Sequence, residues 1–172
     1  MKKINPAEML KIFIVVLTLG MSNIHFAWAG LIEDVENLRN SLKQTDSARK
    51  ELTLRLADLY FDEITEANKA LEVSQTIQAK VLKYRSKAIS LYIEALNGNG
   101  FYQAATSPLK WKISFQLARL YSDGNRFSDA KPFWEKLVAQ NDILDLKREA
   151  ALRLAENLES NQNINSYKKA DE

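Results

Sequence analysis

Residues 117–137 read LARLYSDGNRFSDAKPFWEKL, and this stretch decides the fold of the chain. On both sides of Asp123-Gly124-Asn125, apolar residues recur every three or four positions, which is the spacing of an amphipathic helix. The residues between the two halves favour a turn, because Gly and Asn adopt a positive φ with little strain. The stretch therefore predicts two short helices that fold back on each other as a hairpin.

The composition agrees with an all-α fold. The chain has 172 residues, of which 46% are hydrophobic and 27% are charged, which is enough for one domain with a sizeable core. It contains only five Gly and three Pro, too few for the turns of a β-sandwich or barrel. It contains no Cys, which excludes disulfides, thiolate nucleophiles and cysteine-based zinc sites.

Residues 1–29 resemble a bacterial secretory signal peptide. Lys2, Lys3 and Lys11 precede the apolar run at residues 12–19, and Ala27-Trp28-Ala29 supplies the small residues that signal peptidase reads. We expect cleavage there and a periplasmic location. The alternative is an uncleaved inner-membrane anchor formed by residues 12–32, which carry no charged residue.

Removal of residues 1–29 leaves a neutral chain. The leader holds three of the 24 Lys and Arg residues and one of the 22 Asp and Glu residues, so the remaining charges balance. A neutral chain has no net field to attract nucleic acid or anionic lipid. The single His, His25, also lies in the leader, so the mature protein lacks the commonest general base and metal ligand. We expect no cofactor and no metal site.

The rest of the chain divides into helices. A short amphipathic helix is expected over residues 30–45, with Leu31, Val35, Leu38 and Leu42 on its apolar side. Residues 46–97 contain no Gly or Pro and predict a long hairpin with its turn near residues 73–78. An acidic run at residues 58–72 would then lie beside a basic run at residues 80–87. Residues 46–159 form the predicted helical domain, and the polar residues 160–172 predict a disordered tail.

The pattern Leu117-Ala118-x-x-Tyr121, followed by Ala130 and Trp134, resembles the tetratricopeptide repeat (TPR) family. The fold implied is a short TPR-like array of helical hairpins, with about two repeats, a capping helix and a short N-terminal helix. An upstream copy has its two helices further apart along the chain, and Leu154-Ala155-x-x-Leu158 repeats the first half alone. The residues assigned to packing within the repeats are Ala57, Tyr60, Ala88, Tyr92, Leu117, Ala118, Tyr121, Ala130 and Trp134.

The resemblance also implies a binding surface, because the first helix of each TPR hairpin lines the concave side of the array. Carried onto this sequence, the positions on that side are Lys112, Phe115, Arg119 and Ser122; Leu54, Asp58 and Phe61; and Leu152, Glu156 and Glu159. They combine an apolar floor with a central cation between acidic flanks. Such a surface suits a helix or an extended segment with apolar anchors. The competing interpretation is that Phe115 belongs to the core and Arg119 is simply solvated.

The function expected is that of a non-enzymatic, exported interaction module or scaffold of a Gram-negative envelope machinery, with protein or peptide partners. One alternative is a structural homo-oligomer that assembles through the N-terminal helix. A remote alternative is a carboxylate-based hydrolase that uses Asp58, Asp62, Glu63 and Glu66, since paired acids can hydrolyse glycosides. No nucleotide-binding, serine-hydrolase or metalloprotease motif occurs in the sequence.

We predict cleavage after Ala29. The intact mass of the exported protein should correspond to a chain that begins at Gly30, because the apolar run is short and small residues occupy the cleavage site. A full-length species embedded in the membrane would instead favour the anchor.

Overall fold

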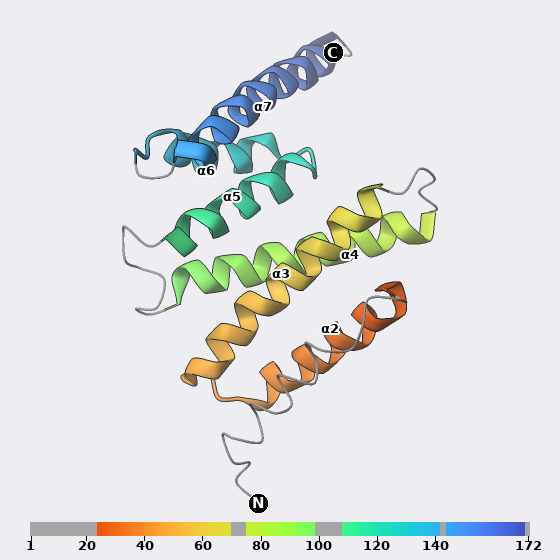
Figure 1. Cartoon of the computed structure of the whole chain (residues 1–172). Helices are drawn as coiled ribbons and strands as arrows, with labels where there is room; N and C mark the ends of the chain where they lie inside the picture. The colour runs from red at the N-terminus through yellow and green to blue at the C-terminus, as the bar shows by residue number, and fades with distance from the viewer. Residues whose placement is uncertain (1–23, 70–74, 99–107, 142–143, 171–172) are drawn as a thin grey trace, which may run out of the picture.

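The computed structural model describes residues 24–69, 75–98, 108–141 and 144–170, and all regular structure within these ranges is helical (Figure 1). The helices are α2 (Ile24–Ser41), α3 (Ser47–Lys69), α4 (Gln75–Asn97), α5 (Pro108–Ser122), α6 (Phe127–Val138) and α7 (Leu144–Ala170). They form a short array of antiparallel helical hairpins, with α2 at one edge and α7 at the other. The predicted all-α hairpin array is therefore confirmed.

The long hairpin is formed by α3 and α4. The predicted turn near residues 73–78 is partly helical, because α4 already begins at Gln75, and the rest of that segment lies outside the described residues. Thr76 lies inside the first turn of α4, where its weak helix propensity is outweighed by the packing of the following residues. The end of α4 at Asn97 and the start of α5 at Pro108 agree with the sequence signals.

The α5–α6 turn follows the predicted chemistry. Asn125 has a φ of 57°, a left-handed conformation that Asn and Gly adopt with little strain. Gly124 has a different role, because a Cβ atom there would lie 3.2 Å from Arg85 Cδ and 3.3 Å from the carbonyl oxygen of Leu120. The missing side chain at Gly124 thus makes room for α4 to approach this turn.

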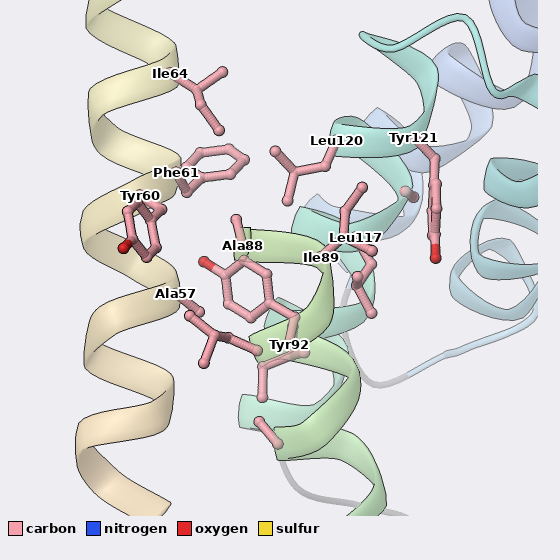
Figure 2. Close-up of a cluster of buried hydrophobic side chains, with 14 of the residues drawn as sticks. Ala57, Tyr60, Phe61, Ile64, Ala88, Ile89, Tyr92, Leu117, Leu120 and Tyr121 are labelled. Carbon is pink, nitrogen blue, oxygen red and sulfur yellow. The ribbon is translucent and has the colours of Figure 1, made fainter. Parts of the chain in front are cut away.

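The core is continuous across the hairpins. Figure 2 shows side chains from α3, α4 and α5 in one cluster, and aromatic rings fill the space beside small residues. The Tyr60 and Tyr84 rings lie 4.8 Å apart, and the Phe115 ring meets the Trp134 ring edge-on at 5.3 Å. All nine residues assigned to packing are buried: Ala57, Tyr60, Ala88, Tyr92, Leu117, Ala118, Tyr121, Ala130 and Trp134.

The N-terminal helix α2 packs on the α3–α4 hairpin through part of the predicted stripe, because Leu31 and Val35 pack against the core. Leu38 of the same stripe is 40% exposed, whereas Ile32, outside the stripe, is buried. The contact face is therefore shifted toward Ile32, where polar contacts also hold the helix. Arg39 donates to both carboxylate oxygens of Glu94 in α4, at 2.6 and 2.8 Å, and to Thr53 Oγ1 in α3 at 2.8 Å.

At both ends of the described chain, helices extend into segments that the sequence analysis assigned differently. Helix α2 begins at Ile24, so it crosses the predicted cleavage site, while the n-region and the apolar run lie outside the described residues. Helix α7 continues to Ala170, although residues 160–172 were expected to be disordered. No Gly or Pro interrupts α7, and extending a helix that already packs on a neighbour costs much less than starting one.

Among the helices of the described ranges, none is both long enough and apolar enough to span a membrane. The anchor alternative, residues 12–32, falls largely outside these ranges.

We predict that Ala118 and Ala130 hold α5 and α6 close together. Both have no exposed surface, so enlarging either to Leu should overpack the interface and lower the free energy of unfolding by about 1–3 kcal/mol. Ala79→Leu, at an exposed position of α4, is the matched control and should leave stability nearly unchanged. Chemical denaturation measures all three variants; parent-like stability of both core variants would refute this packing.

Candidate functional site

The first helices of the array, α3, α5 and α7, bring most of the predicted binding residues to one side. Lys112 Nζ on α5 lies 3.6 Å from Asp58 Oδ2 on α3. Two turns further along α5, the Arg119 guanidinium lies 5.2 Å from the centre of the Phe61 ring. We call this side the first-helix surface and define it by Asp58 and Phe61 of α3, Lys112, Phe115, Arg119 and Ser122 of α5, and Arg153 and Glu156 of α7.

Asp58 has a structural partner as well as a place on this surface. Its Oδ1 accepts a hydrogen bond of 2.6 Å from the hydroxyl of Tyr92, which has no exposed surface. Burial, and then the charge of Asp58, raise the pKa of Tyr92 above its usual range, so the hydroxyl stays protonated as the donor. Asp58 therefore satisfies a buried polar group and keeps one oxygen toward Lys112.

The acidic cluster that suggested a hydrolase is mostly engaged in pairs. Glu63 accepts from Lys80 at 2.7 Å, which is the predicted contact between the acidic run of α3 and the basic run of α4. Glu66 pairs with Lys69 on its own helix. Partial burial, and then the nearby charge of Asp58, raise the pKa of Asp62 above its usual range. Asp62 thus lies in a locally acidic part of the surface, next to Asp58.

Phe115 and Arg119 on α5 are both partly buried. Phe115 is partly buried and packs edge-on against Trp134, as a core residue does. Arg119 is partly buried, with its guanidinium carbon over the Phe61 ring. The cation therefore contacts an aromatic face rather than being fully solvated.

Ser122 joins three helices, which the sequence alone did not predict. Its hydroxyl oxygen accepts from Trp134 Nε1 of α6 and from Asn157 Nδ2 of α7, both at 3.1 Å. Asn157 is 3% exposed and Trp134 is fully buried. Ser122 is therefore better described as the polar junction of α5, α6 and α7 than as a residue free to contact a partner.

A pocket of about 190 Å³ opens beside this junction. Trp134 and Phe127 of α6 line it, together with Ser122 and Asn157, and Arg119 of α5 and Arg153 of α7 lie among its charged residues. The complete lining is Arg119, Ser122, Asp123, Phe127, Trp134, Arg153, Glu156, Asn157 and Ser160. The pocket combines an aromatic wall with charges of both signs.

Several of these residues were not in the predicted set. The one detectable signal was Asn157, a polar residue at helical spacing from Ala150 and Leu154, on the side of α7 that packs inward. Arg153 carried no comparable signal, because solvated charges are common on any helix. It pairs with Glu149 and with Glu156, at 3.3 and 3.1 Å, beside the pocket.

Two predicted positions of α7 are not part of the surface as expected, whereas Leu54 shares the α3 face of Asp58 and Phe61, four and seven residues before them. Leu54 is partly buried and packs on the core. Leu152 is 58% exposed, on the side of α7 away from the pocket, and Glu159 is exposed there too. Leu152 and Glu159 lie on the open side of α7 because Ala150 and Asn157, rather than Ala155, face the neighbouring helices.

Comparisons with known proteins do not assign this chain to a family. No protein-family model matches the chain, and neither the curated proteins nor the solved structures contain a significant match. In the described ranges, no group of three or more His, Cys, Asp and Glu side chains could hold a metal ion.

We predict that Ser122→Ala destabilises the array. The variant leaves the buried donors of Trp134 and Asn157 without their acceptor, which should cost about 1–3 kcal/mol. Ser90→Ala, at an exposed position of α4, is the control and should melt like the parent. Hydrogen exchange should quicken in α7, because Asn157 is one of its anchors. Unchanged stability and exchange would show that the junction is unimportant.

Proposed function

We propose that this protein is a non-enzymatic interaction module of a Gram-negative cell envelope, which binds a protein or peptide partner on the first-helix surface. The observation that carries the proposal is the alignment of Asp58 with Lys112 and of Phe61 with Arg119, next to the α5–α7 pocket. The periplasmic location rests on the leader-like residues 1–29.

The size of the pocket favours a peptide side chain over a small molecule. Pockets that enclose drug-sized ligands or cofactors measure about 300–1,000 Å³. At about 190 Å³, this pocket suits one anchor residue of a longer ligand, with the partly exposed Phe127 as its aromatic contact. The rest of such a ligand would run along α5 toward Phe61 and Asp58.

The charges of the surface indicate how a partner is oriented. Lys112, Arg119 and Arg153 alternate with Asp58, Asp62 and Glu156, so the surface has no large field of one sign. Mixed charges add little affinity at an exposed rim, but they select register and orientation. Apolar anchors therefore supply most of the affinity, with Arg119 as the central polar contact.

Arg119→Glu tests this proposal. It reverses the central cation and should weaken binding by at least about 1–2 kcal/mol, roughly tenfold, in capture from the native envelope fraction. The variant also loses its contact with the Phe61 ring, which costs up to about 1 kcal/mol of stability. Its melting temperature must therefore be measured alongside.

Two matched variants separate binding from folding. Lys83→Glu makes the same charge reversal at an exposed position of α4 and should leave recovery of the partner unchanged. Arg119→Lys keeps the charge and should give an intermediate loss, because Lys lacks the planar guanidinium. Full recovery of the partner by a folded Arg119→Glu protein would rule out the first-helix surface as the binding site.

A further inference from the structure

Helix α7 has an open side at the edge of the array (Figure 1). Ala150 and Asn157 are buried against the neighbouring helices, and Leu154 packs on the core. On the open side, Leu152 is 58% exposed.

Four exposed residues on this side form one stripe: Arg148, Leu152, Ala155 and Glu159. Their spacings of four, three and four residues place them on a single line along the helix, directly opposite Ala150 and Asn157. We call this line the α7 stripe. It begins with a cation, continues with two apolar residues and ends with an anion.

The charges at its two ends have no ion-pair partner within the described part of the chain. Arg153, one turn away on the pocket side, pairs with both Glu149 and Glu156. Arg148 and Glu159 are exposed and belong to none of the ion pairs found among the described residues. Their eleven-residue separation spans about 16 Å of helix, so they cannot pair with each other in one chain.

We propose that the α7 stripe binds the α7 stripe of a second copy, in antiparallel orientation. Reversing the stripe places Arg148 opposite Glu159 of the other copy and Leu152 opposite Ala155, and the two-fold axis repeats both contacts. Two ion pairs thus flank two Leu–Ala contacts. The small Ala155 lets the helices approach, and Leu152 of the other copy fills the space beside it.

Charge complementarity selects this occupant and this orientation. A parallel copy would place Arg148 against Arg148 and Glu159 against Glu159, which is unfavourable. The contact is independent of the first-helix surface, because the stripe lies on the other side of α7 from the pocket residues Arg153 and Asn157. A dimer of this form would leave both partner-binding surfaces open.

The interface is small, since a single pair of helices contributes to it. We therefore expect a reversible dimer with a dissociation constant in the micromolar range or weaker. Sedimentation equilibrium of the protein, purified in the form that its host produces, should show a reversible monomer–dimer equilibrium at loading concentrations of about 1–300 µM.

Charge reversal tests the pairing itself. Arg148→Glu places two like-charged pairs in the dimer and should weaken it roughly tenfold, and Glu159→Arg should do the same. The double variant Arg148→Glu/Glu159→Arg restores opposite charges and should regain the parent affinity. An equimolar mixture of the two single variants should form a heterodimer, because each supplies the charges that the other lacks. Lys83→Glu is the control on α4 and should leave dimerisation unchanged.

Several outcomes would overturn the proposal. A parent protein that is monomeric at about 300 µM does not use the stripe for a second copy. A dimer that neither single variant weakens has its interface elsewhere, for example on α2. Loss of the dimer without rescue by the double variant excludes the antiparallel register. If the α7 stripe instead binds a different protein, this chain should be monomeric and Leu152→Glu should abolish capture of that protein.

Discussion

Four alanines without any exposed surface set the distances between the paired helices: Ala57 and Ala88 in the α3–α4 hairpin, and Ala118 and Ala130 in α5–α6. A methyl group is the largest side chain that such close contacts accept, and larger residues would force the helices apart. Tyr60 and Tyr92 lie beside the alanines of the α3–α4 hairpin (Figure 2), and the buried Trp134 serves the α5–α6 pair, so small and large residues alternate across each pair. The positions of the first helices, and hence of everything on their outer side, follow from these distances.

Polar contacts fix the order in which the helices stack. The Tyr92 hydroxyl donates to Asp58, and this bond ties the core of the long hairpin to its outer surface. The Ser122 hydroxyl oxygen joins α5 to α6 and α7, because it accepts hydrogen bonds from Trp134 and Asn157. Buried donors without partners would cost more than these bonds contribute, so such bonds specify one arrangement over its alternatives. The first-helix surface is therefore a by-product of the same contacts that hold the array together.

The sequence predicted the helices and the core well because both follow from local spacing. The α5–α6 turn was recognisable from Asp123-Gly124-Asn125, and Asn125 indeed has a positive φ. What spacing could not provide was the rotation of the terminal helices. Arg39 rotates α2 by pairing with Glu94, and Asn157 rotates α7 by reaching Ser122. Each contact joins residues far apart in the chain, and a single polar residue in a periodic helix gives little indication of its distant partner. The same limit explains why Leu152 was expected in the binding surface and lies on the open side instead.

The central claim is that a partner lies along the first helices rather than the second ones. Site-specific photo-crosslinking in the native envelope tests it directly, with a photoreactive residue at position 112 on α5 or at position 83 on α4, both exposed lysines in the parent chain. We expect a covalent adduct with one discrete partner from position 112 and none from position 83. An adduct from position 83 alone would contradict the account.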